Sequence, residues 1–189
     1  MKQRAVFIDR DGTISEEVGY VNHLSRYRVF PYAAEAIKLL NELGWRAILV
    51  TNQAGVARGY FTEDLIEMVH GILRQELERK GARLDAIYYC PHHPSVGVPP
   101  FKLDCDCRKP KPGLIERAAR DFSLDLAQSW MVGDRYGDVE LARNAGVRSA
   151  FVLSGYGRGE WEYQRATWQH EPDMIADDLL AAVRKIIEQ

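Results

Sequence analysis

The sequence predicts an α/β protein with a doubly wound, parallel sheet of five to six strands. Two stretches, residues 47–50 and 130–132, are nearly continuous runs of apolar residues. Such runs are typical of strands that are buried on both faces, as the strands of a parallel sheet are. Strand-like and helical segments also alternate along the chain, which predicts helices that connect parallel strands. We therefore expect one domain that spans residues 1–189.

The element boundaries follow from local signals. Threonine 62 and the two acidic residues after it are typical of a helix start, and glycines follow three of the helical stretches, where helices often end. Residues 173–188 alternate apolar and charged positions at helical spacing, so this segment should pack on the sheet as a helix. The expected strands are 5–9, 46–51, 85–89, 129–133 and 148–153, and the expected helices are 33–43, 62–80, 113–122, 137–145 and 174–188.

The composition excludes several classes of protein. Of the 189 residues, 46% are hydrophobic and 28% are charged, as in soluble globular proteins with a substantial core. The formal net charge of -2 argues against nucleic acid as a partner. No apolar run approaches the roughly 20 residues of a membrane span, and the first residues lack the features of a signal peptide. We expect a cytoplasmic monomer that acts on a small molecule and binds neither nucleic acid nor a membrane.

Four polar clusters fall at strand ends or helix starts. They are Asp9-Arg10-Asp11-Gly12-Thr13, Thr51-Asn52-Gln53, Arg108-Lys109-Pro110 and Gly133-Asp134 with Asp138. Taken alone, each cluster has a structural explanation: a turn, a cap of the next segment, a stiff linker or a helix N-cap. Ligands of open α/β sheets bind beyond the carboxyl ends of the strands, where these clusters should meet. Together they therefore predict a functional site.

Phosphoryl transfer is the chemistry that these residue types could perform together. Asp9 and Asp11 point to the same side of the chain, and two carboxylates so close repel each other unless a cation is present. Asp9 could act as a covalent nucleophile and Asp11 as general acid and base. Thr51 and Lys109 could offset the charge of the transferred phosphoryl group. Mg²⁺ prefers oxygen ligands, and Asp9, Asp134 and a backbone carbonyl near Asp11 would form a plausible site.

A second metal is predicted in the loop of about residues 90–107. Cys90, Cys105 and Cys107 are the only cysteines, and with a histidine they form the pattern C-x-H-x12-C-x-C. Four such ligands suit one tetrahedral zinc ion, and a closed set of four argues for a structural ion. His92 and His93 both compete for the histidine position. The alternative is a set of unrelated buried thiols.

The four clusters, in this order along the chain, resemble the motifs of the haloacid dehalogenase (HAD) superfamily of phosphohydrolases. The resemblance implies a Rossmann-like fold, with Asp9 as nucleophile, Asp11 as acid and base, and Asp134 as a Mg²⁺ ligand. It also implies that Thr51 and Lys109 stabilise the phosphoryl group, and it favours His92 over His93 as the zinc ligand. The role of Asp138 stays open, because the last acidic residue of this motif can orient the site without touching the metal.

The intervals between the motifs leave no room for the cap domains of larger superfamily members. Specificity should therefore come from residues 14–30, residues 53–61 and the zinc loop. The sequence resembles zinc-binding, capless members that act on sugar bisphosphates and make precursors of lipopolysaccharide or S-layer sugars. The residues implied or proposed to bind substrate are Arg10, Glu17, Gly19, Tyr20, Asn52, Gln53, Ala54, Arg108 and Arg135.

Two of these residues also have a physical argument. Arg108 and Arg135 flank the metal motifs, and arginine binds phosphate oxygens in a bidentate manner. They could therefore bind the sugar or its second phosphate, although surface arginines are often only solvated. Two other functions remain: a histidinol-phosphate phosphatase, and a zinc-stabilised binding module without turnover.

Overall fold

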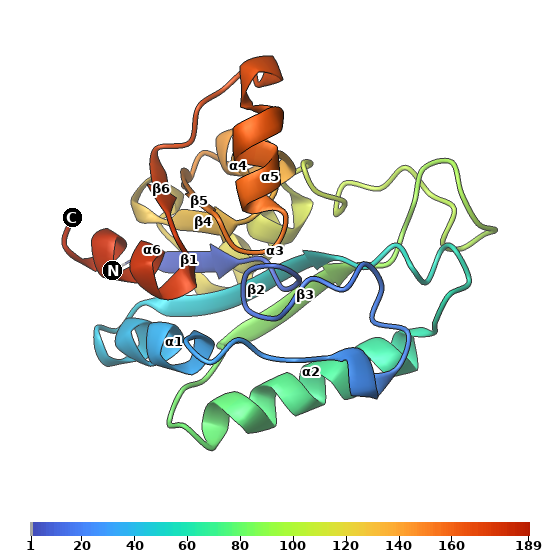
Figure 1. The fold of residues 1–189 in the computed structure, drawn as a ribbon, viewed down its shortest axis with the longest axis horizontal. Coiled ribbons are helices and arrows are strands. Elements are labelled where there is room, and N and C mark those ends of the chain that lie inside the picture. Colours follow the sequence, from blue (N-terminus) through green and yellow to red (C-terminus); the bar gives the residue numbers. More distant parts are fainter. Residues whose placement is uncertain (1) are drawn as a thin grey trace.

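The computed structural model describes residues 2–189, which contain a six-stranded parallel sheet with helices on both faces (Figure 1). The strand order is β3-β2-β1-β4-β5-β6. This arrangement confirms the predicted fold class, and the sheet has the upper number of strands expected. The strands are β1 (Ala5–Ile8), β2 (Arg46–Asn52), β3 (Ala86–Cys90), β4 (Trp130–Gly133), β5 (Arg148–Val152) and β6 (Met174–Ala176).

Six α-helices and three short 3-10 helices connect these strands in the described part of the chain. Among these helices, none has the length and apolar character that crossing a membrane requires. The α-helices are α1 (Ala33–Glu42), α2 (Glu63–Glu78), α3 (Gly113–Phe122), α4 (Tyr136–Ala145), α5 (Gly157–Tyr163) and α6 (Leu179–Ile187). The 3-10 helices are η1 (Leu24–Arg26), η2 (Leu126–Gln128) and η3 (Arg165–Thr167).

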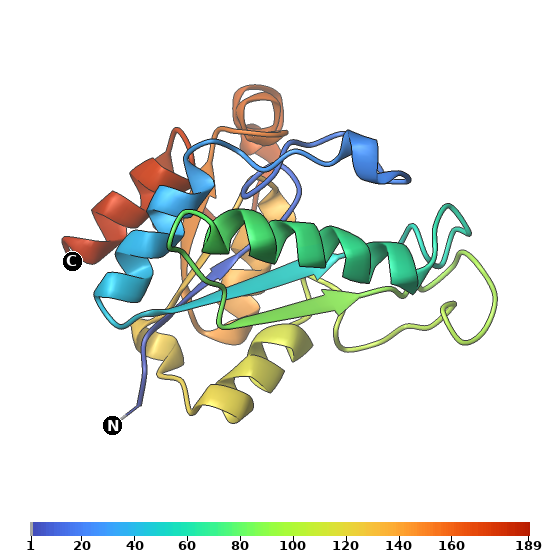
Figure 2. The same cartoon turned by 90° about the horizontal axis from the view of Figure 1, so that it is seen from below.

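Both faces of the sheet are buried, which explains the continuous apolar runs. In β1, Val6 and Ile8 pack into a cluster that includes apolar residues of α1, α2 and α6. Ala5 and Phe7 point the other way, into a cluster formed with α3 and α4. Figure 2 shows α2 and α3 on opposite sides of the sheet. Alternate residues of one strand therefore contribute to two separate cores.

The order in which the chain adds strands to the sheet reverses between β1 and β4. From β1 the chain adds β2 and β3 on one side, and it then returns to add β4, β5 and β6 on the other. β1 and β4 are parallel neighbours, with Ile8 aligned with Val132. The backbone N–H of Asp9 continues this pairing by donating to the Val132 carbonyl oxygen at 2.9 Å. The residues that follow both strands therefore emerge side by side at a topological switch point, where ligands of such sheets bind.

The helix predicted over 174–188 is wrong in its first part. Met174–Ala176 forms β6, which pairs with β5. The helix begins only at Leu179, after Asp178, whose side chain accepts a hydrogen bond from the N–H of Ala181. A strand of three residues is too short to show a periodicity of its own. The helical spacing of the residues that follow it therefore predicts a helix that begins too early.

Helix α5 was not predicted. Two of its first three residues are glycines, which are unfavourable inside helices, so the sequence carries no helix signal there. Its position is set by tertiary contact instead. A Cβ atom at Gly157 would overlap the carbonyl oxygen of Val152 at the end of β5. The helix is therefore packed too closely against the sheet edge to allow a side chain at this position.

Candidate active site

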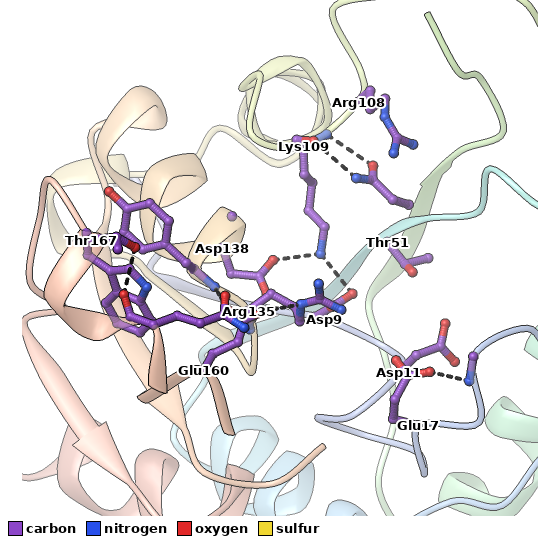
Figure 3. Close-up of a pocket in the computed structure, with 16 residues that line it drawn as sticks. Asp9, Asp11, Glu17, Thr51, Arg108, Lys109, Arg135, Asp138, Glu160 and Thr167 are labelled. Carbon is purple, nitrogen blue, oxygen red and sulfur yellow. Dashed lines mark hydrogen bonds and ion pairs between the residues drawn. The ribbon is translucent and has the colours of Figure 1, made fainter. Parts of the chain in front are cut away.

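The polar residues that follow β1 and β4, and those that end β2, converge on one pocket at the carboxyl edge of the sheet (Figure 3). Its volume is about 420 Å³. All four residues predicted as catalytic line it: Asp9, Asp11, Thr51 and Lys109. The predicted substrate-binding residues in its lining are Glu17, Gly19, Asn52, Arg108 and Arg135. The four sequence motifs are therefore brought together in space, as predicted.

Lys109 is a buried cation at the centre of this pocket. Its side chain is 7% exposed, and its ammonium group lies 2.8 Å from Oδ1 of Asp9 and 2.7 Å from Oδ1 of Asp138. The third contact is a hydrogen bond of 3.3 Å to the carbonyl oxygen of Val50. The two carboxylates raise the pKa of Lys109 and outweigh the opposite effect of burial. The amine therefore stays charged at any physiological pH.

Asn52 fixes the backbone of Lys109. Its side-chain oxygen accepts the N–H of Lys109 at 3.0 Å, and its side-chain nitrogen donates to the Lys109 carbonyl oxygen at 3.1 Å. The side chain at the end of β2 thus holds the start of the segment that leads into α3. We expected Asn52 to bind substrate. In the structure, the oxygen and the nitrogen of its side-chain amide both form hydrogen bonds with the backbone of Lys109.

Three carboxylates gather beside Lys109: those of Asp9, Asp134 and Asp138, with one oxygen of each within 4.8 Å of the others. Burial raises the pKa of Asp9 to about 7, with a further increase from Asp138 and a decrease from Lys109. Burial also raises the pKa of Asp134 well above its ordinary value, and the charges of Asp9 and Asp138 add to this. One lysine cannot balance three buried carboxylates, so the group suits a divalent cation.

Two glycines make room for the Asp134 carboxylate. Gly12 and Gly155 have φ angles of 84° and 54°, and a Cβ atom on either would overlap the carboxylate of Asp134. The same carboxylate accepts the N–H of Tyr156 at 2.8 Å and the hydroxyl of Thr13 at 3.4 Å. Asp134 is therefore enclosed by residues that follow β1 and β5 as well as by its own strand.

Asp11 is held by side chains beneath the pocket. Arg10, which is 1% exposed, donates from Nε to Oδ1 at 3.0 Å and from Nη2 to Oδ2 at 2.7 Å. Gln53 donates to Oδ2 of Asp11 at 2.9 Å and also to the hydroxyl oxygen of Thr51 at 3.0 Å. Arg10 and Gln53 were expected to contact substrate. The structure places them outside the pocket lining, where they orient two of its residues.

The other two predicted substrate-binding residues also lie outside the pocket lining. Ala54 is buried, with 9% of its surface exposed. Tyr20 is 39% exposed and packs edge-on against the ring of Tyr60, with a centroid distance of 4.9 Å. This contact joins two of the loops that were expected to determine specificity.

A histidine lies behind the Arg10–Asp11 pair. His70, on α2, is 1% exposed, and its Nε2 atom lies 3.5 Å from Nη1 of Arg10. Burial lowers the pKa of His70 from 6.5 to about 3, and the positive charge of Arg10 lowers it further. His70 is therefore neutral in the folded protein near neutral pH.

The predicted zinc ligands form a second cluster, at the end of β3 and in the loop after it. Ligand atoms of Cys90, His92, Cys105 and Cys107 all lie within 4.8 Å of one another. The Sγ atoms of Cys90 and Cys105 are 3.5 Å apart, and Nδ1 of His92 lies 3.4 Å from Sγ of Cys107. Hydrogen bonds from neighbouring groups, with Cys90 contributing most, lower the pKa of the Cys107 thiol to about 5. The identity of the four ligands and their close spacing suit a tetrahedral zinc ion.

His93 is committed to other contacts. Its Nδ1 atom accepts the backbone N–H groups of Ser95 and Val96, each at 3.2 Å, and its Nε2 atom lies 3.3 Å from Nη2 of Arg58. The structure thus groups His92, and not His93, with the three cysteines. The carbonyl oxygen of His92 also accepts a hydrogen bond of 3.2 Å from Nη1 of Arg108, which links this cluster to the pocket.

One wall of the pocket was missed by sequence reasoning. It is formed by the start of α4, by α5 and by η3, through Tyr136, Gly137, Glu160, Gln164, Thr167 and Trp168. The rings of Tyr136 and Trp168 stack at a centroid distance of 4.8 Å. The only sequence signals were a glycine cluster around the start of α5 and an isolated tryptophan, and neither indicates a site by itself.

The order of the strands, the carboxylates after β1 and β4, and the buried lysine define a hydrolase of the HAD type. A family model described as HAD-hydrolase-like matches residues 106–182. A D-glycero-D-manno-heptose-1,7-bisphosphate 7-phosphatase of Thermosynechococcus vestitus is 42% identical over 192 residues, which cover 98% of this chain and 96% of that protein. The chain therefore belongs to the D-glycero-D-manno-heptose-1,7-bisphosphate 7-phosphatase family.

Two further comparisons agree with this assignment. A Haemophilus ducreyi protein named as the phosphatase of the beta form is 42% identical over 154 residues, covering 81% of this chain and 84% of its own. The crystal structure of a D,D-heptose 1,7-bisphosphate phosphatase from B. bronchiseptica, complexed with magnesium and phosphate, has a TM-score of 0.87. It is 30% identical, and the match covers 98% of this chain and 99% of that one.

The buried His70 predicts a specific dependence of stability on pH. As the pH falls below about 6.5, the unfolded chain takes up a proton on this histidine, whereas the folded protein does not. The free energy of unfolding should therefore decrease with falling pH, by roughly 1.5 kcal/mol between about pH 6.5 and about pH 5 from this residue. The decrease should be smaller by that amount in His70→Gln. Urea unfolding at several pH values measures both slopes, and equal slopes would contradict the assignment.

Proposed function

We propose that this chain hydrolyses the 7-phosphate of D-glycero-D-manno-heptose 1,7-bisphosphate and releases heptose 1-phosphate and inorganic phosphate. The observation that carries the proposal is the buried Lys109 between Asp9 and Asp138, in a pocket that also contains Arg108 and Arg135. The lysine and the carboxylates suit phosphoryl transfer, and the arginines suit a second phosphate. The names of the relatives support this particular sugar.

Asp9 is the nucleophile in this proposal. Its Oδ1 atom already accepts the backbone N–H of Arg10 at 2.7 Å and the contact from Lys109, so we assign the attack to Oδ2. The Oδ2 atom forms a bond to phosphorus, and the bond from phosphorus to the sugar oxygen breaks. Lys109 and the hydroxyl of Thr51 stabilise the charge on the phosphoryl oxygens. The hydroxyl oxygen of Thr51 accepts a hydrogen bond from Gln53, and its hydrogen can still donate to a phosphoryl oxygen.

Asp11 transfers the protons. Its acid form donates a proton to the departing sugar oxygen, and the resulting carboxylate then takes a proton from water. The oxygen of that water attacks phosphorus, phosphate leaves, and the Asp9 carboxylate is regenerated. The bidentate contact from Arg10 and the contact from Gln53 hold the Asp11 carboxyl group in the position that both steps require.

Mg²⁺ is the cofactor that we assign to this pocket. Asp9, Asp134 and a backbone carbonyl near Asp11 would hold it, and Asp138 would orient Lys109 beside it. A bound Mg²⁺ supplies positive charge against the carboxylates and the phosphoryl oxygens. Burial raises the pKa values of Asp9 and Asp134, and the neighbouring carboxylates raise them further, so a bound cation would stabilise the ionised forms of both groups.

Zinc is the second metal, held by Cys90, His92, Cys105 and Cys107, and its role is structural because the four ligands leave no open position. Two backbone contacts connect it to the pocket. Besides the bond from Arg108 to the His92 carbonyl oxygen, the N–H of Gln53 donates to the Cys90 carbonyl oxygen at 2.7 Å. Zinc would therefore position an arginine that faces the substrate and the glutamine that supports Asp11.

Replacement of the nucleophile is the first test. Asp9→Asn should lower kcat by at least about a thousandfold, because an amide cannot form the aspartyl-phosphate. Asp64→Asn, at an exposed aspartate in the first turn of α2, is the matched control and should keep full activity. Steady-state phosphate release and circular dichroism measure activity and folding. Substantial activity in a folded Asp9→Asn protein would refute the covalent mechanism.

A substrate panel tests the sugar. Both anomers of D-glycero-D-manno-heptose 1,7-bisphosphate, histidinol phosphate and fructose 1,6-bisphosphate should be compared by kcat/KM at saturating Mg²⁺. One heptose anomer should have the highest value. A preference for histidinol phosphate would overturn the proposed substrate, and no turnover of any ester would favour a binding module without catalysis.

Removal of zinc should affect both structure and rate. Metal analysis should find about one zinc ion per chain, and a zinc-selective chelator with Mg²⁺ in excess should lower kcat/KM at least about tenfold, because ligand displacement moves supporting residues. Limited proteolysis should then cleave within residues 90–107. Added zinc should restore both properties. A zinc-free protein with the original activity and cleavage pattern would disprove the structural role.

A further inference from the structure

The wall formed by α5 and η3 lies across the pocket from Asp11. In Figure 3, Glu160 and Thr167 are on the opposite side from Asp11 and Glu17, and Arg135 extends between Glu160 and the centre of the pocket. Figure 1 shows that α5 comes from the last quarter of the chain and stands above the end of β5. Phosphoryl transfer as proposed uses no residue of this wall, so its function requires a separate explanation.

Glu160 makes two contacts from this wall, and it is only 7% exposed. Its Oε1 atom pairs with Nε of Arg135 at 2.5 Å, and its Oε2 atom accepts the backbone N–H of Tyr136 at 2.7 Å. The guanidinium group of Arg135 also lies over the ring of Tyr156, with its carbon 4.4 Å from the ring centroid. Two residues of the α5 segment thus hold one arginine, although half of the arginine side chain is exposed.

The α5 segment and the backbone of Arg135 each contact one of the carboxylates beside Lys109. The N–H of Tyr156 donates to Oδ2 of Asp134, and the N–H of Arg135 donates to Oδ2 of Asp138 at 3.2 Å. The backbone of Arg135 is therefore fixed by the reaction centre, and its side chain by Glu160. An arginine held at both ends has a defined position relative to the attacking atom of Asp9.

The geometry leaves the phosphate-binding part of Arg135 available. Glu160 pairs with Nε, so the two terminal nitrogens, Nη1 and Nη2, can still donate to an anion. An exposed arginine loses side-chain freedom when it binds phosphate, and prior ordering by Glu160 reduces that loss. A buried carboxylate in a pocket for an anionic substrate is unfavourable by itself. The ion pair with Arg135 offsets the charge of the Glu160 carboxylate and so allows it to be buried in this pocket.

We propose that Glu160 is a positioning residue that holds Arg135 for the phosphate of the substrate that does not react. The proposal rests on the proposed function, because it requires a bisphosphate substrate. It makes the α5 segment a second support for specificity, independent of the zinc loop that positions Arg108. Glu160 acts through the arginine and touches no reacting atom.

The test is a double-mutant cycle with Glu160→Gln and Arg135→Met. Glutamine keeps the shape and can still accept the N–H of Tyr136, but it loses the ion pair. In the wild-type background, Glu160→Gln should raise KM for heptose 1,7-bisphosphate about threefold to fivefold, with a smaller effect on kcat. KM for p-nitrophenyl phosphate, which has one phosphate, should change less. In the Arg135→Met background, Glu160→Gln should have no further effect on KM.

Glu162→Gln, at an exposed position of the same helix, is the matched control and should match the wild type. Equal changes with both substrates, or the same change in KM with and without Arg135, would overturn the proposal and leave Glu160 as a support of α4 alone. Fructose 1,6-bisphosphate separates this outcome from failure of the proposed function. If the wild type hydrolyses only fructose 1,6-bisphosphate, the proposed heptose substrate is wrong. The double-mutant cycle is then measured with fructose 1,6-bisphosphate. If it hydrolyses no bisphosphate, the role for a second phosphate is also wrong.

Discussion

The charge balance around Lys109 is the constraint on which the rest of this site depends. Three buried carboxylates, those of Asp9, Asp134 and Asp138, lie together at the switch point of the sheet, and two of them, Asp9 and Asp138, contact the ammonium group of Lys109. Burial raises the pKa of Asp9 to about 7, the neighbouring carboxylates add to this rise, and a divalent cation would stabilise the ionised group. With that cation present, the three carboxylates are balanced by the ammonium group and the cation, so the group no longer repels an incoming phosphate. Lys109 and the cation can then stabilise the negative charge of the phosphoryl group.

The fold supports this group from several elements at once. Asn52 at the end of β2 holds the backbone of Lys109, and Gly12 and Gly155 leave the space that Asp134 occupies. Arg10, buried against α2, fixes Asp11. These contacts come from strands that are neighbours in the sheet, so the parallel register sets their relative positions. Loops then add the groups that face the substrate, among them Arg108 and Arg135.

Much of this could be predicted from the sequence, because the necessary signals are local. The apolar runs at 47–50 and 130–132 show strands buried on both faces, and the four motifs show which strand ends carry the chemistry. The cysteine pattern identified the members of the second metal cluster, and the structure groups His92 with them. These features depend on residues that are close together in sequence.

The missed features depend on distant contacts. Glu160 has the appearance of an ordinary surface charge in the sequence, and only the packing of α5 against β5 brings it to Arg135. The partners of Arg10 and Gln53 were also missed, since a motif shows that a residue belongs to a site but not which way its side chain points. The strand β6 has three residues and is defined by its pairing with β5 rather than by its own pattern.

Trapping of the intermediate tests the central claim most directly. A substrate labelled in its 7-phosphate should be mixed with the Mg²⁺-loaded protein, quenched in acid within one turnover, and reduced with borohydride. The account predicts protein-bound label in the quenched sample before reduction. After reduction, residue 9 should be converted to homoserine, which mass spectrometry of its peptide locates. Rapid phosphate release without any protein-bound label, or label at a residue other than Asp9, would contradict it.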